Sequence, residues 1–291
     1  MEEIRYEAPT SISRASELLR EPGARVLAGG TDLIVQMRTG RALPSVFVDV
    51  KRIPELTSLA LGPDELWLGA AVPAVAVVEH AEISRLWPGL VEAIDLIGST
   101  QIQGRASVGG NLCNASPAAD TVPALCVIAA VCVIKGPGGE RRVPVESFNT
   151  APGRNVLAAG ELLVGLRIPR PATRSADAYL RFIPRTEMDI AVVGAGVSIR
   201  LDASGVCTHA RVALGAVAPT VILVPAAAAA LVGSRGEAAA LARAAVAASA
   251  AARPIADKRG TVEYRRKISG VLSERAAAAA FARAGAAGSP A

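Results

Sequence analysis

Aromatic residues are scarce in this sequence: Phe, Tyr and Trp together make up 3% of its 291 residues. Since 51% of the residues are nevertheless apolar, Ala, Val, Leu and Ile must fill the core of an ordinary globular protein. Histidine is rarer still, and neither His80 nor His209 stands in a recognisable arrangement with Ser, Cys or a carboxylate. We therefore expect both histidines to be structural or surface residues, and no side chain to act as an obvious acid–base catalyst.

Cysteine is also in short supply. The four cysteines, Cys113, Cys126, Cys132 and Cys207, show no CxxC spacing. Structural zinc sites and iron–sulfur clusters normally need several closely organised ligands. The sequence thus predicts no metal or cluster site in this chain and favours buried thiols in a reducing compartment.

A large charge of one sign and a long apolar run are missing as well. The 31 basic and 26 acidic residues give a net charge of +5, and no basic run interleaved with aromatics indicates nucleic-acid binding. The short cluster Arg265–Lys267 lies in a helical stretch and is interpreted as a solvated helix face. The N-terminus has no signal-peptide core, and the longest apolar stretches are rich in Ala, which is typical of packed helices. We expect a cytoplasmic protein with no membrane span and no nucleic-acid partner.

Turn signals and apolar periodicity predict an α+β protein large enough for two modest domains. Ser11 is a candidate N-cap for a helix over 11–20. Further helices are predicted over 33–37, 87–97 and 122–130, and strands over 25–28, 46–50, 65–70, 131–135, 141–145 and 162–168. Gly136-Pro-Gly-Gly139 is typical of a hairpin turn between the strands over 131–135 and 141–145. Residues 169–177 read as a linker. Beyond it we predict strands over 179–183, 190–201 and 210–216 and helices over 237–251 and 261–283, the Ala-rich tail being either packed helix or low-complexity sequence.

A strand that runs into Ala28-Gly-Gly-Thr-Asp32 and then a helix is one device for binding phosphate. Glycines let successive backbone N–H groups converge on an anion, and the helix N-terminus adds a favourable dipole. Thr31 adds a hydroxyl. The same pattern also occurs as an ordinary tight turn, so alone it decides nothing.

A second glycine-rich loop repeats this device about 80 residues later in the sequence. Ser107 supplies a hydroxyl, Gly109 and Gly110 a bare backbone, and Asn111 an amide, so two loops could clamp a pyrophosphate. Asp120 follows, either accepting from ribose-type hydroxyls or capping the helix that begins beside it. Neither loop is a GxGxxG fingerprint or a P-loop, so a dinucleotide would bind by another architecture.

The two loops stand in strings that carry a resemblance. LAGGTDLIVQMRTG, IGSTQIQGRASVGGNLCNASPAADTVPAL and GELLVGLRIP resemble the FAD-binding subunits of molybdenum hydroxylases, the carbon monoxide dehydrogenase and xanthine dehydrogenase family. RTEMDIAVVGAGVSIRLD and ARPIADKRGTVEYRRKISGVL resemble the C-terminal domain of that family. The resemblance implies a two-lobed FAD-binding domain of the vanillyl-alcohol-oxidase (PCMH) type over 1–170, with lobes of about 1–55 and 56–170. An antiparallel sheet with helices would follow over 178–285.

The resemblance also implies which residues contact FAD. The first pyrophosphate loop would comprise Leu27, Ala28, Gly29, Gly30, Thr31, Asp32 and Leu33. The second would comprise Ser107, Gly109, Gly110 and Asn111, with Ser116 and Asp120 toward ribitol or ribose. Ile97 and Ile102 would lie close to the isoalloxazine ring, Val164 at an adenine-side or ring-packing position, and Arg181 near the polar edge of the flavin. For Arg181 the alternative is a charge on a strand surface.

The sequence departs from the family pattern at the flavin. Some members place an aromatic where Ile97 stands, whereas the nearest aromatics here in sequence are Trp87 and Phe148. The benzoyl-CoA-reductase branch of the family inserts a cysteine-bearing loop for an extra iron–sulfur cluster, and this sequence has no comparable loop. Asp189 would either approach the flavin or fix the end of a strand.

The implied function is electron transfer. FAD in this chain would take electrons from a [2Fe–2S] cluster in a small partner subunit, itself fed by a molybdenum cofactor in a large subunit, within a dimer of heterotrimers. The acceptor would be NAD, oxygen or a quinone. Two alternatives stay open: a non-catalytic nucleotide-binding scaffold subunit, and a stand-alone flavin oxidase.

Overall fold

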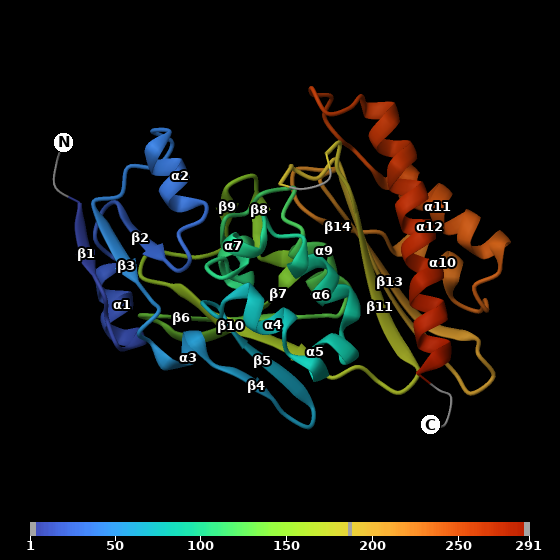
Figure 1. Cartoon of the computed structure of the whole chain (residues 1–291), viewed down its shortest axis with the longest axis horizontal. Helices are drawn as coiled ribbons and strands as arrows, with labels where there is room; N and C mark the ends of the chain where they lie inside the picture. Colours follow the sequence, from blue (N-terminus) through green and yellow to red (C-terminus); the bar gives the residue numbers. More distant parts are fainter. Residues whose placement is uncertain (1–3, 186–187, 288–291) are drawn as a thin grey trace.

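The computed structural model describes residues 4–185 and 188–287. It is an α+β structure in which an N-terminal lobe, a middle lobe and a C-terminal sheet with helices follow one another along the long axis (Figure 1). Within the described ranges, no helix is both long and apolar enough to span a bilayer.

The N-terminal lobe is a small parallel sheet with strand order β1-β3-β2. Its elements are β1 (Arg5–Glu7), α1 (Ile12–Leu18), β2 (Ala24–Leu27), α2 (Leu33–Arg38) and β3 (Val46–Asp49). The predicted cap is present, because the Ser11 hydroxyl accepts a hydrogen bond from the Arg14 amide. Leu27 pairs with Asp49 in the register of β2 and β3, so both strands end at the same edge of the sheet.

The middle lobe is built on an antiparallel five-stranded sheet of order β4-β5-β10-β6-β7. The strands are β4 (Leu59–Leu61), β5 (Glu65–Gly69), β6 (Val131–Gly136), β7 (Gly139–Pro144) and β10 (Leu162–Pro169). The glycine-rich turn predicted between two strands is the β6–β7 hairpin, in which Gly136 pairs with Gly139.

Short helices and a two-stranded hairpin complete the middle lobe. They are α3 (Pro54–Thr57), α4 (Ala74–Val78), α5 (Ala81–Leu86), α6 (Pro88–Asp95), α7 (Thr100–Gln103), α8 (Val108–Cys113), α9 (Thr121–Val127), the 3-10 turn η1 (Val145–Ser147), β8 (Asn149–Ala151) and β9 (Arg154–Asn155). Trp87 and Phe148 are buried in this core. Every residue of α9 is buried, because the helix lies between the middle lobe and the C-terminal sheet.

The C-terminal part is an antiparallel sheet of order β11-β12-β13-β14, with α12 packed on β11 and β12 (Figure 1). Its elements are β11 (Ser175–Phe182), β12 (Val193–Leu201), β13 (Cys207–Gly215), β14 (Ile222–Leu223), α10 (Pro225–Leu231), α11 (Ala238–Ala251) and α12 (Val262–Ala286). The Ala-rich tail is packed helix: Ala244, Ala276 and Ala280 are buried. A Cβ at Gly270 would lie only 2.9 Å from the Ala245 carbonyl oxygen, which shows how closely α11 and α12 approach.

Several sequence predictions need correction. The linker is shorter than 169–177, because β10 extends to Pro169 and β11 begins at Ser175; likewise the strand predicted from 190 begins at Val193. The basic cluster is not simply a solvated helix face. The Arg265 guanidinium is buried, where it donates to the carbonyl oxygens of Val192 and Ala216 and pairs with Asp257.

β11 joins the C-terminal part to the middle lobe. A Cβ at Gly89 would lie 2.6 Å from the Ala178 amide nitrogen, so α6 packs directly on the β11 backbone. The Asp177 carboxylate accepts from the Leu90 amide at the start of α6, and Arg283 of α12 pairs with Glu92. These contacts hold the C-terminal part against the middle lobe. The division into domains of 1–170 and 178–285 stays a prediction.

Candidate functional site

The first glycine loop connects β2 to α2 and is pressed against the second loop. A Cβ at Gly29 would lie 1.9 Å from the Arg105 carbonyl oxygen, and Gly30 has φ +76°, so both positions require glycine. In the described part of the chain, the backbone N–H groups of residues 29–32 have no hydrogen-bond acceptor. Unpaired backbone amides in a concave loop can bind an anion.

The second glycine loop begins α8. Ser107 is its N-cap, and the Ser107 hydroxyl accepts from the Gly110 amide at 3.0 Å. A Cβ at Gly109 would lie 2.4 Å from the Ala70 carbonyl oxygen, so this glycine permits close packing on the middle lobe. Asn111 is held by Thr121, whose hydroxyl donates to the Asn111 Oδ1 at 2.6 Å.

Both loops line one pocket of about 800 Å³. This volume lies within the roughly 300–1,000 Å³ of typical ligand pockets. The predicted residues that line it are Ala28, Gly29, Gly30, Thr31, Asp32, Leu33, Ile97, Ser107, Gly109, Gly110 and Asn111. Loops far apart in sequence therefore meet where an elongated ligand with two phosphates fits.

The pocket also contains residues that the sequence predictions missed. Gln36 and Asn114 both line it, and the Gln36 amide donates to Asn114 Oδ1 at 2.8 Å. Asn155 and residues 157–163 form another part of the wall. Asn114 stood in the string that carried the resemblance, and the polar spacing of the second loop was the available signal. Residues 160–163 stood in the string GELLVGLRIP, which carried the resemblance, whereas residues 157–159 had no such signal.

Six predicted residues do not line this pocket. Leu27 ends β2, Val164 is buried in the N-terminal core, and Ile102 packs against the middle core. The Ser116 hydroxyl accepts from the Ala118 amide. Asp120 and Arg181 form an ion pair with each other. Whether any of the six touches a cofactor stays a prediction.

Asp120 and Arg181 form a buried ion pair close to one end of the pocket. Arg181 Nη1 lies 3.0 Å from Asp120 Oδ2, and the Tyr179 hydroxyl donates to Asp120 Oδ1 at 3.0 Å. Arg181 also donates to the Leu96 carbonyl oxygen, next to Ile97 in the pocket wall. The Arg181 side chain is only 5% exposed, so it is not a strand-surface charge. Although Asp120 occupies the N-cap position of α9, its side chain makes no capping hydrogen bond.

Asp120→Asn is expected to flatten the pH dependence of stability. Burial raises the pKa of Asp120 to about 6, against the opposing pull of Arg181 and Tyr179. The folded protein thus keeps this proton up to about pH 6, whereas the unfolded chain releases it near pH 3.8. The stability that Asp120 contributes to the wild type is therefore fully present below pH 3.8. It falls by about 2–3 kcal/mol as the pH rises from 3.8 to about 6. Urea unfolding at pH 4 and pH 7 measures this. A variant with the same fall as wild type contradicts the assignment to Asp120.

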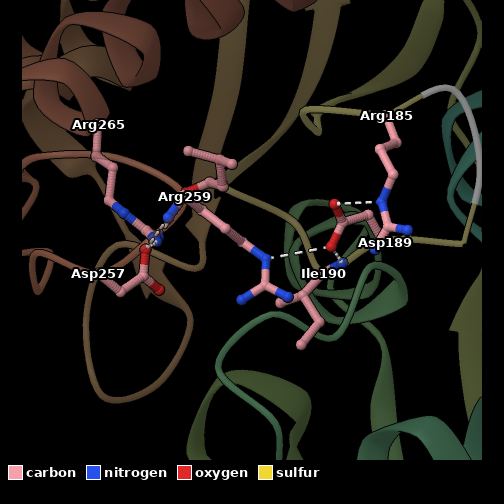
Figure 2. Close-up of polar contacts among 7 residues, drawn as sticks. Arg185, Asp189, Ile190, Asp257, Arg259 and Arg265 are labelled. Atoms are coloured by element: carbon pink, nitrogen blue, oxygen red, sulfur yellow. Dashed lines mark hydrogen bonds and ion pairs between the residues drawn. The ribbon is translucent and has the colours of Figure 1, made fainter.

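Asp189 fixes the connection between β11 and β12. Its carboxylate accepts from the Ile190 amide at 2.7 Å, from Arg185 Nε at 3.2 Å and from Arg259 Nε at 3.1 Å. Figure 2 shows Arg185 and Arg259 reaching this carboxylate from opposite sides. These contacts agree with the alternative in which Asp189 fixes a strand end, and Asp189 does not line the pocket.

Two of the charged residues that line the pocket, Glu21 and Glu161, are held in ion pairs. Glu161 pairs with Arg141, whose hydrogen bond holds the pKa of Glu161 below its ordinary value. Burial raises the pKa of Asp32 and raises the pKa of the Cys113 thiol to about 12. Cys113 is therefore a protonated thiol at neutral pH and not a nucleophile.

Among the described residues, no group of three or more His, Cys, Asp and Glu is placed to hold a metal ion. A second hollow of about 520 Å³ lies between α1 and the β6–β7 hairpin. Neither glycine loop reaches it.

Comparison with known proteins gives the class of this fold. Residues 2–171 match the family model for the FAD binding domain in molybdopterin dehydrogenase, and residues 178–280 match the CO dehydrogenase flavoprotein C-terminal domain. The fold is thus a mixed α+β FAD-binding domain followed by a domain with an antiparallel sheet and helices, as predicted.

Individual relatives narrow the class to a family. The chain is 33% identical to the carbon monoxide dehydrogenase medium chain of Hydrogenophaga pseudoflava over 96% of this chain and 97% of the relative. It is 32% identical to the putative xanthine dehydrogenase FAD-binding subunit of Escherichia coli, over 75% of each. A solved carbon monoxide dehydrogenase structure from H. pseudoflava superposes with a TM-score of 0.92 at 32% identity, covering 96% of this chain and 98% of that one. The chain therefore belongs to the FAD-binding medium subunits of molybdenum-dependent dehydrogenases, the carbon monoxide dehydrogenase and xanthine dehydrogenase family.

Proposed function

We propose that this chain binds FAD across its two glycine loops and passes electrons from a partner [2Fe–2S] subunit to an external acceptor. The observation that carries the proposal is the meeting of both loops in one pocket, with the N–H groups of residues 29–32 unpaired in the described structure. Two amide-rich loops on one cavity fit the two phosphates of a dinucleotide. When bound, FAD supplies a ring that accepts and releases electrons.

The residues of this chain bind and orient the cofactor. In the proposal, the first loop and the α8 N-terminus hold the pyrophosphate, and Ile97 provides apolar surface beside the ring. The Asp120–Arg181 pair fixes that end of the wall through the Leu96 carbonyl oxygen. No proton transfer by a side chain is required.

The proposal includes partner subunits. One similar solved structure is described as a Cu,Mo-CO dehydrogenase. On this basis we propose a large subunit with a molybdenum cofactor and a small [2Fe–2S] subunit, assembled as a dimer of heterotrimers. NAD, oxygen and quinones all stay open as acceptors, and a cytoplasmic location stays a prediction.

An absorption spectrum of the purified chain after addition of FAD and gel filtration tests the proposal. We expect bound flavin in about one equivalent, which stays oxidised with small organic substrates alone and loses its visible absorption when an excess of the already reduced partner [2Fe–2S] subunit is added. A chain without flavin bands contradicts FAD binding and favours the scaffold alternative. Flavin that is reduced directly by a small organic substrate, without any partner, favours the oxidase.

A further inference from the structure

Lys51 contacts the first glycine loop from the neighbouring strand. β2 and β3 are parallel and end together, with Leu27 opposite Asp49. Residues that follow parallel strands leave the sheet at the same edge. As a result, the Lys51 ammonium donates a hydrogen bond to the Ala28 carbonyl oxygen at 2.9 Å.

The Lys51 side chain is itself held in place. Asp49 Oδ1 accepts from Lys51 Nζ at 2.7 Å and from the Lys51 amide at 3.0 Å, and the Tyr6 hydroxyl donates to Asp49 Oδ2. Burial by itself raises the pKa of Asp49, but the hydrogen bonds from Lys51 and Tyr6 outweigh it and hold that pKa below its ordinary value. Asp49 therefore stays ionised, and the pair adds no net charge to the pocket.

The carbonyl oxygen of Ala28 determines where the Gly29 amide points. The structure contains no cis peptide among the described residues, and in a planar trans peptide the C=O and N–H bonds point in opposite directions. Holding the Ala28 oxygen toward Lys51 therefore turns the Gly29 N–H away from Lys51. A cation on the carbonyl oxygen also polarises the peptide and strengthens its N–H as a donor.

The other side of this peptide is equally constrained. Gly29 packs on the Arg105 carbonyl oxygen with no room for a Cβ, and Gly29 lines the pocket. Its N–H has no acceptor in the structure as described. An oriented, polarised and unpaired amide at the wall of a pocket is a donor prepared for an anion.

We propose that Lys51 is a positioning residue that orients the Gly29 N–H toward a phosphate of the bound dinucleotide, and that Asp49 and Tyr6 hold Lys51 in this role. The inference rests on the proposed function, because it needs a phosphate in the pocket. Lys51 acts through the Ala28–Gly29 peptide and not by its own contact with the ligand.

Lys51→Met in the full chain tests the inference by calorimetric titration with FAD, ADP and riboflavin. Methionine keeps most of the apolar stem and removes the donor. We expect the dissociation constants of FAD and ADP to rise about tenfold, the effect of one lost charge-assisted hydrogen bond. Riboflavin has no phosphate, so its affinity should change less than about twofold. Lys51→Arg, which keeps a cationic donor, should restore FAD affinity.

The matched control is Lys135→Met. Lys135 is equally exposed, 37% against 36% for Lys51, and pairs with Glu140 in the β6–β7 hairpin away from this pocket. The Lys135→Met variant should bind FAD, ADP and riboflavin with the affinities of the wild type. Equal weakening of FAD and riboflavin in Lys51→Met, or unchanged FAD affinity, overturns the role of Lys51. If the wild-type chain does not bind FAD at all, the proposed function fails with it. Tight FAD binding by wild type and Lys51→Met alike removes only this inference.

Discussion

Gly110→Val is expected to weaken FAD binding at least about a hundredfold while the chain stays folded. Gly110 lines the pocket in the first turn of α8. The nearest atom that a Cβ there would meet is the Ser107 Oγ at 3.0 Å, a side chain that can rotate. A valine side chain would therefore occupy space in the pocket and exclude a phosphate from the α8 amides.

The choice of glycine matters for this test. At Gly29 and Gly109 a Cβ would meet backbone atoms at 1.9 Å and 2.4 Å, so substitution there would disturb the fold as well as the pocket. Gly110 separates the two effects. The far-UV circular dichroism and the unfolding midpoint of Gly110→Val should resemble those of the wild type, whereas its flavin absorption after gel filtration should disappear.

Gly138→Val is the matched control for Gly110→Val. Gly138 lies at the exposed tip of the β6–β7 hairpin, where a Cβ meets no atom within 4 Å and φ is not positive. This variant should retain FAD like the wild type. Stoichiometric FAD on Gly110→Val would remove the second loop from the binding site.

Arg181→Leu is expected to destabilise the chain by about 3–5 kcal/mol at pH 8, because it leaves Asp120 buried without its cation. The pair is buried on both sides, with exposed fractions of 5% and 12%. At pH 5 the loss should be smaller. The pKa of Asp120 is already raised to about 6 by burial, and without Arg181 the carboxyl takes up a proton more readily. Urea unfolding at both pH values measures the difference.

Two further variants separate lost charge pairing from lost packing. The double variant Asp120→Asn with Arg181→Leu should lie within about 1–2 kcal/mol of wild type, since no unpaired charge is left and only the donor to Leu96 is missing. Arg185→Leu removes an arginine that is 72% exposed and should cost less than about 1 kcal/mol. A double variant as unstable as Arg181→Leu would contradict the electrostatic explanation.

The elements near the glycine loops were predictable because their signals are local. Ser11 caps α1, and the strand–glycine–helix order around Gly29 appears in the structure as β2, the loop and α2. Alternation and glycine turns likewise located the β6–β7 hairpin. Such features depend on neighbours within a few residues, which periodicity and turn chemistry describe.

Features that depend on distant contacts were not predictable in the same way. Arg265 looked like part of a solvated basic face, yet it is buried because Val192, Ala216 and Asp257 offer it three acceptors. Helix α9 stops at Val127, before the predicted end at 130, and Ala129 adopts φ +56°. Only tertiary packing decides these positions.

The same distinction applies to the pocket. Its glycines were predictable because two glycine-rich loops stand in strings that carry the resemblance, although each loop alone is also typical of an ordinary tight turn. Residues 157–159 of the wall lie in no string that carries the resemblance, and the resemblance gave no reason to expect Asp120 and Arg181 to pair with each other. Pairing of this kind requires knowledge of how β11 lies on α6 and α9.

The ion pair between Asp120 and Arg181 has a consequence for the order of events during synthesis. The glycine loops leave the ribosome before β11, which carries both Arg181 and Tyr179. Until β11 joins the growing chain, the Leu96 carbonyl oxygen and the Asp120 carboxylate lack their donors. The wall at Ile97 is therefore completed late, and we expect FAD to be loaded onto the finished subunit and not onto the nascent first domain.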